Sequence, residues 1–294
     1  MPTRPSIVGS GTRRSFGAGQ VVQVYQTPYT YKTVNNNREA DYNIRYRGSG
    51  ISALFGATCP GQVYDESEDY AGAASGGHEG DATRSIYGDA SIGWLRDRLH
   101  TQIGARLDSY TTWRSKVTYS VGATYRIVPA LALYTHYGTS FTRPTLDQLY
   151  DPLYGNKRLA PENASTIEAG LRGHEFGGAL TENHTYWHSY VDNVVTFDYN
   201  IYNPRIVSGD LYGEYANSEA ERSQGVEPEM ACRVAAHWLF TGNYTHTDGY
   251  LDNAGIWELM IENARNMGNL GLTYTTARFD VGANLFATGR RPQS

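Results

Sequence analysis

The chain has 294 residues, with 24 tyrosines, 32 glycines, 2 cysteines and only 19% charged residues. No apolar run approaches the roughly 18 residues that a membrane-spanning helix needs, so the sequence excludes a helical membrane protein. The net charge is −5, with acidic and basic residues mixed along the chain, and without a basic stripe nucleic acid is not an expected partner.

Strands and one long loop are predicted in the N-terminal third of the chain. A first strand is predicted at Phe16–Gln26, and Tyr42–Arg47 and Ile51–Ala57 are predicted to form a hairpin around a glycine-rich turn. A long loop rich in glycine, alanine and acidic residues is predicted from Thr58 to Thr83. This part of the chain therefore reads as strand, tight turn, strand and long loop.

The middle of the chain shows the cleanest alternation. The segment Leu99–Tyr110 places Ile103, Ala105 and Leu107 on one face and polar residues on the other, and Val117–Ile127 repeats the pattern. Because successive side chains of a strand point to opposite faces, both segments require one apolar and one polar side.

The remaining strands continue a regular series. They are predicted at Ile86–Trp94, Leu131–Tyr137, Thr166–Arg172, Leu180–Phe197, Tyr212–Met230, His237–Thr247, Asn266–Tyr274 and Phe279–Thr288. The chain then holds about 13 strands, most of them near the ~9–11 residues that cross a bilayer when tilted. Short turns and long loops alternate between them. This ordering predicts an all-β fold, a partial transmembrane antiparallel up-and-down β-barrel, with short turns at one membrane face and long loops at the other.

The stretch from Ser140 to Glu162 carries a more specific signal. It reads SFTRPTLDQLY at 140–150, YGN at 154–156 and LAPE at 159–162. This stretch resembles the mid-barrel segment of TonB-dependent outer-membrane receptors, and within that family the vitamin B12 receptors. Four further pieces resemble the family in the same order: IGARLDSY at 103–110, VDNVVTFD at 191–198, YANSEAERSQGVE at 215–227 and MGNLGLTY at 267–274.

The resemblance implies an architecture larger than this chain. A receptor of the family has an N-terminal plug with a short TonB-contacting box, inside a barrel of about 22 strands. We recognise no plug, no such box and no closing C-terminal strand in residues 1–294. We therefore expect residues 1–294 to be part of a receptor barrel, because the unpaired edges of an open sheet are not tolerated in lipid.

The function implied by the resemblance is uptake across the bacterial outer membrane. Such a receptor binds a scarce metal chelate outside the cell, is energised by the TonB complex through its plug, and is surrounded by lipid and lipopolysaccharide. Cobalamin or a related corrinoid is the first expectation for the ligand, with an iron–siderophore or haem as the alternative. Two hypotheses from other classes stay open: a porin-like pore without a plug, and a structural or assembly component.

Candidate site residues fall into two groups. The long loops carry aromatic and polar residues that suit a large, partly apolar ligand. The ligand-binding candidates are Phe141, Asp147, Tyr150, Tyr154, Tyr199 and Tyr202. By the resemblance, polar residues on the inner face of the strands would hydrogen-bond the plug, and the candidates are Arg106, Asp108, Arg126, Glu168 and Arg172.

No catalytic constellation is recognised, so we do not expect an enzyme. Cys59 and Cys232 have no metal-binding spacing and are predicted to be unpaired thiols, with one disulfide as the alternative. His184 and His188 lie four residues apart, on one face of a strand, and are predicted to be lumen or interface residues rather than metal ligands. The segment Asp65–Asp69 is predicted to be a solvated acidic loop, with a calcium site as the alternative.

Overall fold

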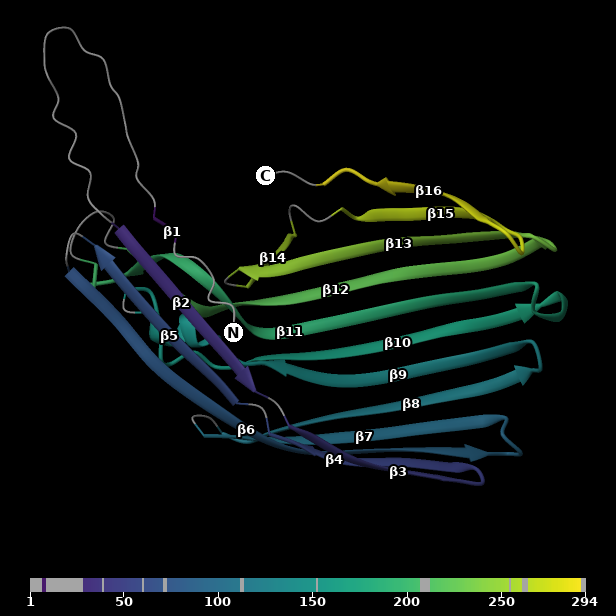
Figure 1. Ribbon diagram of the computed structural model, residues 1–294, viewed down its shortest axis with the longest axis horizontal. Coiled ribbons are helices and arrows are strands. Elements are labelled where there is room, and N and C mark those ends of the chain that lie inside the picture. The colour runs from purple at the N-terminus through teal and green to yellow at the C-terminus, as the bar shows by residue number, and fades with distance from the viewer. Residues whose placement is uncertain are drawn as a thin grey trace, which may run out of the picture.

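The computed structural model describes residues 7–8, 29–38, 40–59, 61–70, 73–111, 114–151, 153–206, 212–253, 255–260 and 264–291. Most of these residues lie in strands of one antiparallel sheet (Figure 1). Within these ranges, no helix is long and apolar enough to cross a bilayer. The predicted strand at Phe16–Gln26 falls outside the described residues.

The strands of this sheet follow one another along the chain. They are β1 (Ile7–Val8), β2 (Tyr29–Arg38), β3 (Asp41–Gly48), β4 (Ile51–Thr58), β5 (Gly61–Tyr70), β6 (Ala73–Trp94), β7 (Leu99–Tyr110), β8 (Lys116–Val128), β9 (Leu131–Thr142), β10 (Glu162–Glu175), β11 (Leu180–Tyr202), β12 (Tyr212–Ala235), β13 (Trp238–Asn253), β14 (Ile256–Leu259), β15 (Asn266–Thr275) and β16 (Asp280–Thr288).

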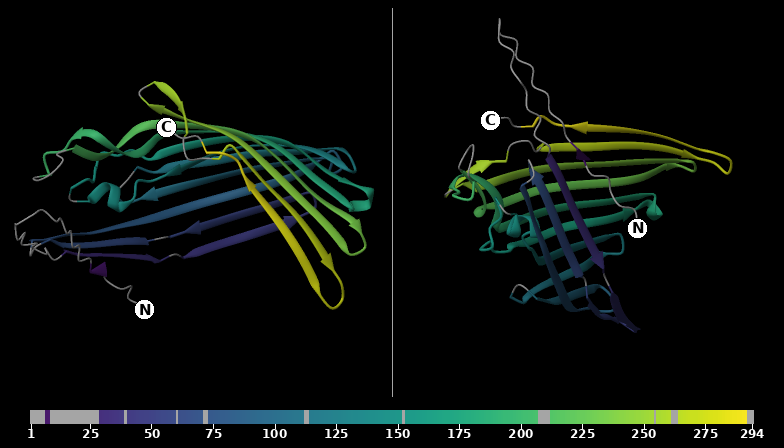
Figure 2. Two further views of the ribbon diagram at one scale, coloured as in Figure 1. Left: turned by 90° about the horizontal axis from the view of Figure 1, so that it is seen from above. Right: turned by 60° about the vertical axis from the view of Figure 1, so that its left-hand side comes forward.

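The connectivity is that of an up-and-down meander. From β6 to β13 each strand pairs antiparallel with the next, and β15 and β16 continue the series. The tight turns gather at one end of the strands and the longer connections at the other (Figure 1). The sheet curves into an open trough, and it does not close within the described residues (Figure 2). The predicted fold, a partial antiparallel up-and-down barrel, is confirmed.

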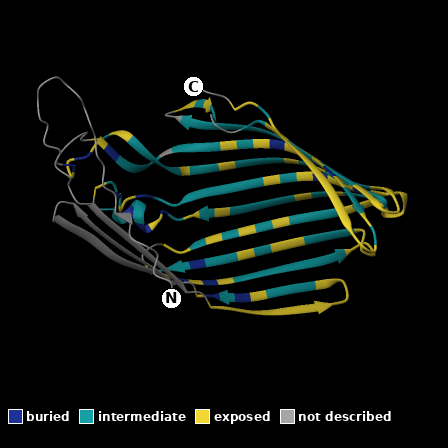
Figure 3. Ribbon diagram, turned by 45° about the horizontal axis from the view of Figure 1, so that its top comes forward, coloured by how far each residue is buried: buried dark blue, intermediate teal, exposed yellow. Residues whose placement is uncertain are grey.

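The two faces of the sheet differ in polarity. Leu133 on β9 and Leu171 on β10 are cross-strand partners on one face, and both are exposed. On the other face Arg172, Asn183 and Glu229 are partners across three strands. Exposed and half-buried residues alternate along the strands (Figure 3). The polar face is hollowed across several strands, so it is the concave side, and the apolar face points outward.

The prediction of a long loop from Thr58 to Thr83 is wrong. Strand β4 is followed after a short break by β5, which pairs with the beginning of β6 on one side and with β2 on the other. Ladder hydrogen bonds are made by the main chain, so a hairpin extends without apolar alternation in its sequence. Strands β11 and β13 likewise run past their predicted ends, to Tyr202 and Asn253.

Glycine permits close contact between strands at the centre of the sheet. Gly170 on β10 lies beside Tyr134 of β9, and the Tyr134 hydroxyl is 2.5 Å from the Oγ1 of Thr185 on β11. A Cβ atom at Gly170 would collide with the main-chain oxygen of His184 and with the Tyr134 ring. Both neighbours are fixed by the ladder and by the hydroxyl contact.

We expect Gly170→Ala to destabilise the barrel by about 1–3 kcal/mol, because overpacking here must displace the main chain. At Gly268 the nearest atom to an added Cβ is 3.5 Å away, an ordinary contact, so Gly268→Ala is the matched control. Heat-induced unfolding, followed by the mobility change on a denaturing gel, should show a lower midpoint for Gly170→Ala alone. Equal midpoints for the two variants would contradict the close packing.

Candidate ligand-binding mouth and lumen

A short helix interrupts the long connection between β9 and β10. Helix α1 (Leu146–Tyr150) begins after Thr145, whose hydroxyl accepts the N–H of Gln148 (3.1 Å). The Gln148 side chain in turn accepts the N–H of Thr145 (2.8 Å), which completes a capping box. Leu146 and Leu149 are buried, and α1 contacts β6. The connection therefore folds back over the sheet instead of projecting freely.

The residues after α1 are fastened to the beginning of β12. The N–H of Tyr215 donates to the Tyr154 carbonyl (3.1 Å), and the Asn156 amide donates to the Tyr215 carbonyl (2.9 Å). The N–H of Asn156 also donates to the Gln148 carbonyl (2.8 Å), which ties this segment back to α1. The connection thus reaches β6 on one side and β12 on the other, so it lies across the long-loop end of the trough.

Asn203 joins this connection to the next one, between β11 and β12. Its amide donates to the carbonyls of Leu153 and Gly213, both at 2.7 Å. Its carbonyl oxygen accepts from the N–H and the Nε of Arg205, both at 3.1 Å. Asn203 is only 1% exposed, and both its donors and its acceptor are engaged.

Two further side chains complete the junction. Arg205 donates to the Gly155 carbonyl (2.7 Å) and forms an ion pair with Glu214 (3.2 Å). Asn217 accepts the N–H of Ala160 (2.7 Å) and donates to the carbonyl of the same residue (2.9 Å). We call the described residues of 145–160 and 197–217 the mouth unit. The number of cross-connections indicates that it behaves as one body.

An aromatic cluster lies inside the mouth unit. The Phe197 ring contacts the rings of Tyr154, Tyr199 and Tyr215 edge-on, with centroid distances of 5.4, 4.8 and 5.3 Å. Each such pair contributes about 0.5–1.5 kcal/mol beyond its buried area. Tyr199 is nevertheless 74% exposed, so the cluster presents a fixed aromatic ring and hydroxyl to a ligand.

The Tyr215 hydroxyl keeps its proton over a wide pH range. Tyr215 lies in the loop-end extension of β12. Burial raises its pKa above the ordinary 10.0, and the carboxylates of Asp147 and Asp151 raise the pKa further. Any stability that the neutral hydroxyl contributes is complete below pH 10 and is lost as the pH rises through the raised pKa.

The mouth unit contains most of the predicted loop residues. Tyr154 and Tyr199 meet around Phe197, and Tyr202 packs edge-on against Tyr212 with centroids 5.8 Å apart. Tyr202 is also exposed. These tyrosines come from two connections that are about 50 residues apart in the sequence.

The other three predicted ligand-binding residues lie outside the aromatic contacts of Phe197 and Tyr212. Asp147 and Tyr150 lie on α1. Phe141 lies at the end of β9, with its ring 5.9 Å from that of Tyr110, and Arg143 lies over the same Tyr110 ring at 4.5 Å. Phe141 is therefore part of a second aromatic contact. The ligand role of all six residues stays a prediction.

Two of the predicted lumen residues belong to a network within the barrel wall. Arg106 donates from Nε to Asp108 (2.8 Å) and from Nη2 to Ser85 (2.8 Å) and Thr58 (3.1 Å). The Ser85 hydroxyl donates to the same Asp108 oxygen, and Asp108 is only 4% exposed. This network connects β4, β6 and β7. Much of the hydrogen-bonding capacity of Arg106 and Asp108 is therefore already used inside the barrel wall.

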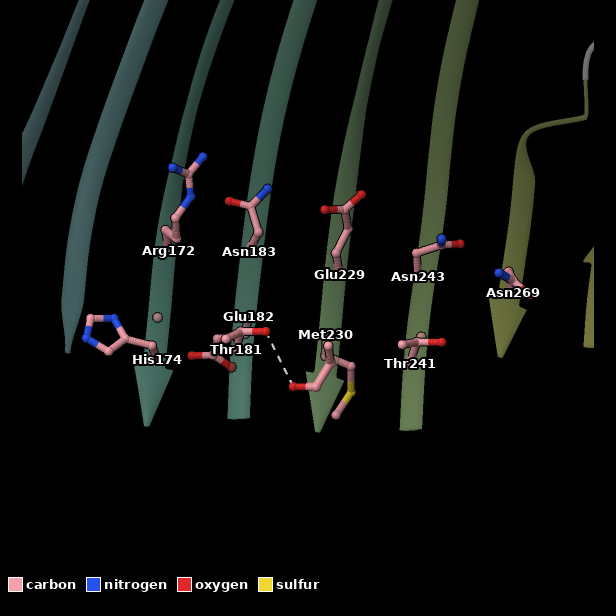
Figure 4. Close-up of a pocket in the computed structure, with 13 residues that line it drawn as sticks. Arg172, His174, Thr181, Glu182, Asn183, Glu229, Met230, Thr241, Asn243 and Asn269 are labelled. Atoms are coloured by element: carbon pink, nitrogen blue, oxygen red, sulfur yellow. Dashed lines mark hydrogen bonds between the residues drawn. The ribbon is translucent and has the colours of Figure 1, made fainter. Parts of the chain in front are cut away.

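A row of polar side chains crosses the concave face near the tight turns (Figure 4). Its members are cross-strand partners on β10 to β15: Arg172, Asn183, Glu229, Asn243 and Asn269. They line a hollow of about 440 Å³. The Oδ1 atoms of Asn183 and Asn269 are buried and have no hydrogen-bond partner. Such a row suits a polar partner inside the trough.

The remaining lumen candidates lie nearby. Glu168 and His136 are 3.7 Å apart and line a second hollow of about 270 Å³ with Arg172. The Arg172 guanidinium lies over the Tyr134 ring at 5.2 Å. Arg126 is exposed. All three candidates share the concave face, as the alternation predicted, and their contact with a plug stays a prediction.

Within the described residues, no three histidine, cysteine or acidic side chains gather to hold a metal ion. Cys59 and Cys232 are both free. Asp65–Asp69 lies in strand β5 and not in a loop, which corrects the predicted surroundings of that segment. Calcium binding there stays the untested alternative to a solvated acidic segment.

The comparisons with known proteins agree with this architecture. The sequence profile "TonB dependent receptor-like, beta-barrel" matches residues 5–294. The chain belongs to the TonB-dependent receptor β-barrel family. The Vitamin B12 transporter BtuB of Vibrio cholerae is 31% identical over 137 residues, which are 46% of this chain and 20% of that protein. The chain thus matches about a fifth of the length of that relative.

Solved structures of this fold superpose on most of the chain. The copper transporter OprC is 14% identical, with a TM-score of 0.72 over 89% of this chain and 44% of its own. The siderophore receptor PirA from Acinetobacter baumannii is 14% identical, with a TM-score of 0.66 over 92% of this chain and 44% of its own. At these identities the likeness shows the fold alone.

Membership of the TonB-dependent receptor family places the barrel in the outer membrane. In such barrels short turns face the periplasm and long loops face outside. The mouth unit is therefore extracellular, and the apolar convex face contacts lipid. The expectations of family, fold and location are confirmed.

Proposed function

We propose that this chain forms the barrel wall of a TonB-energised receptor that takes up a metal chelate, with a corrinoid such as cobalamin as its ligand. The mouth unit is the observation that carries this proposal. A receptor for a scarce ligand needs a rigid extracellular surface, because ordering loops upon binding lowers affinity. Tyr199 and Tyr202 supply such a surface on a body that Asn203 and Asn217 fasten.

The corrinoid is preferred because the matched relative is a vitamin B12 transporter. The alternative is an iron–siderophore, since several proteins of the same fold are named as siderophore receptors. Both ligands are large, partly apolar chelates with a polar periphery, which exposed tyrosines contact through ring and hydroxyl.

In this proposal the polar concave face is the surface that contacts the plug. The row from Arg172 to Asn269, together with Arg126 and Glu168, would hydrogen-bond a plug through which the TonB complex acts. The buried, unpartnered amide oxygens of Asn183 and Asn269 support a polar partner there. Arg106, held by Asp108, would contribute through the hydrogen-bonding capacity that the barrel wall leaves free, since its side chain is 39% exposed.

Equilibrium binding to de-energised cells that display the full gene product tests the ligand. We expect saturable binding of cyanocobalamin, and Tyr199→Ala should weaken it by at least about tenfold, as for an exposed aromatic anchor. Tyr42 is 71% exposed on the convex face, so Tyr42→Ala is the matched control and should leave affinity unchanged. Binding of ferric siderophores in place of cyanocobalamin would select the alternative. Binding of neither would contradict the proposal.

A further inference from the structure

The outward face of β11 can be followed from the tight turn to the outer boundary of the membrane. His184 and His188 are the cross-strand partners of Leu171 and Ile167, which are exposed on the lipid side. Both histidines therefore face outward, and Tyr190 follows on the same face. A strand tilted by about 45° rises roughly 24 Å over about ten residues, close to the ~25 Å height of the apolar band. Tyr190 lies that far from the start of β11, so it lies at the outer boundary of the lipid core.

A hollow of about 260 Å³ lies on the outward face at this level. It is lined from β8, β9, β10 and β11, and its polar outward-facing residues are Tyr119, Thr139, Asn163, Ser165, Tyr190 and Asp192. The buried Oδ1 atoms of Asn163 and Asp192 have no hydrogen-bond partner within the described residues. Small side-chain rotations turn these oxygens towards a donor in the hollow. Acyl chains supply no donor, so the hollow suits a ligand that carries hydroxyl groups.

An arginine without a counter-charge lies beside the hollow. Arg222 on β12 is the cross-strand partner of Tyr190, so it faces outward at the same level, and it is exposed. Its guanidinium lies 5.0 Å from the centroid of the Tyr250 ring and 4.6 Å from that of the Trp257 ring. Among the residues that the structure describes, Arg222 has these two ring contacts and no ion pair or hydrogen bond. Its N–H groups are therefore available to an anion.

We propose that the hollow and Arg222 form a binding site for a phosphorylated glycolipid of the outer leaflet, of the lipopolysaccharide kind. Sugar hydroxyls of this lipid donate to Asn163 and Asp192 in the hollow, and its phosphate accepts a pair of hydrogen bonds from the Arg222 guanidinium. Arginine binds phosphate in this paired geometry, and aromatic rings in contact with the guanidinium keep it oriented. We call the hollow and Arg222 the glycolipid site.

The surroundings of the glycolipid site match the other parts of such a lipid. Towards the tight turns, the outward residues Val121, Ile167 and Leu171 are exposed and apolar, and they offer a surface to the acyl chains. The long loops of an outer-membrane barrel face outside, so the glycolipid site lies at the outer leaflet. An arginine that only reaches the membrane surface needs no hollow beside it. The inference depends on the outward register and the membrane location, and not on the transported ligand.

Native mass spectrometry of the full gene product in detergent tests the site, with bisphosphorylated lipid A as the titrated probe. We expect saturable binding of one lipid A, which Arg222→Leu weakens at least about tenfold because a charge-assisted pair of hydrogen bonds is lost. Ser165→Leu fills the hollow and should weaken binding as well. Arg278→Leu, at an exposed arginine in a tight turn, and Ala169→Leu, on the outward face of β10 but outside the hollow, are the matched controls and should leave affinity unchanged.

Three results would overturn the proposal. Equal affinities of Arg222→Leu and Arg278→Leu would show that the cation does not hold the phosphate. Equal affinities of Ser165→Leu and Ala169→Leu would show that the hollow does not hold the sugar. Binding of dephosphorylated lipid A or of phosphatidylglycerol as tightly as bisphosphorylated lipid A would mean that the surface does not select a phosphorylated glycolipid. Gel mobility before and after heating checks that each variant is folded.

Discussion

Replacing Asn203 by alanine is expected to weaken ligand binding by at least about tenfold while the barrel stays folded. The substitution removes four hydrogen bonds from a residue that is 1% exposed. The carbonyls of Leu153 and Gly213 and the N–H and Nε of Arg205 then lose one partner each, and the Gly213 carbonyl does so in a buried setting. Each buried group left unsatisfied costs about 1–3 kcal/mol.

This loss acts on the mouth unit and not on the strands. The bonds of Asn203 join two extracellular connections, so their removal lowers the population of the ordered mouth. Apparent affinity falls in proportion to the population that is competent to bind. Binding of cyanocobalamin to intact cells measures the effect, and limited proteolysis should show new cleavage within 145–160 or 197–217.

Asn200→Ala provides the matched control for Asn203→Ala. Asn200 lies three residues away, is exposed, and bonds only locally to Asp198. The Asn200→Ala protein should bind the ligand with the same affinity as the unsubstituted protein. Unchanged affinity and protease resistance in Asn203→Ala would contradict the view that the two connections form one body.

Replacing Asp108 by alanine is expected to destabilise the barrel by about 2–4 kcal/mol, because it removes the counter-charge of a partly buried arginine. Asp108 accepts from both Arg106 and Ser85, and it is 4% exposed. Without it the Arg106 guanidinium keeps the hydroxyls of Ser85 and Thr58 and the face of the Tyr87 ring, but no opposite charge. The strands β4, β6 and β7 lose the polar tie between them.

Thermal unfolding in detergent measures this second effect. At about 2–4 °C for each kcal/mol in a protein of this size, the midpoint should fall by roughly 4–16 °C. Asp89→Ala is the control, because Asp89 lies on the same concave face, on the neighbouring strand β6, and is not part of the network. A midpoint within about 2 °C of the control would mean that the network adds little to stability.

The membrane-crossing hairpins can be predicted from the sequence, because the requirement for one apolar and one polar face is visible within each strand. Segments such as Leu99–Tyr110 alternate with period two, and the structure has β7 over the same residues. The alternation fails above the membrane, where neither face must be apolar. For that reason the sequence predicts a loop where the structure has strand β5 (Gly61–Tyr70).

The mouth unit could be predicted only in part. Its helix α1 had a readable signal, the Thr145–Gln148 capping box that follows Pro144, and the aromatic residues of the loops were recognised. The bonds of Asn156, Asn203 and Asn217 link segments about 50 or more residues apart. An asparagine in a loop has the same neighbours in the sequence whether its side chain hydrogen-bonds within its own turn or to a distant loop.

The orientation of His184 and His188 shows a similar limit. Alternation placed His184 and His188 on one face of a strand, but both the lumen and a protein interface accept histidine. The register with Leu171 and Ile167 decides between these faces, because those residues define the lipid side. Cross-strand pairing is the information that a single sequence lacks.

The central claim is active uptake by the receptor that contains this barrel, and energy-dependent transport of radiolabelled cyanocobalamin tests it most directly. The full gene is expressed in cells that lack their own corrinoid receptor, with and without a functional TonB. We predict accumulation that requires TonB and that Asn203→Ala reduces. Accumulation that is unchanged without TonB, together with leakage of small hydrophilic solutes, would contradict the account and indicate a passive pore.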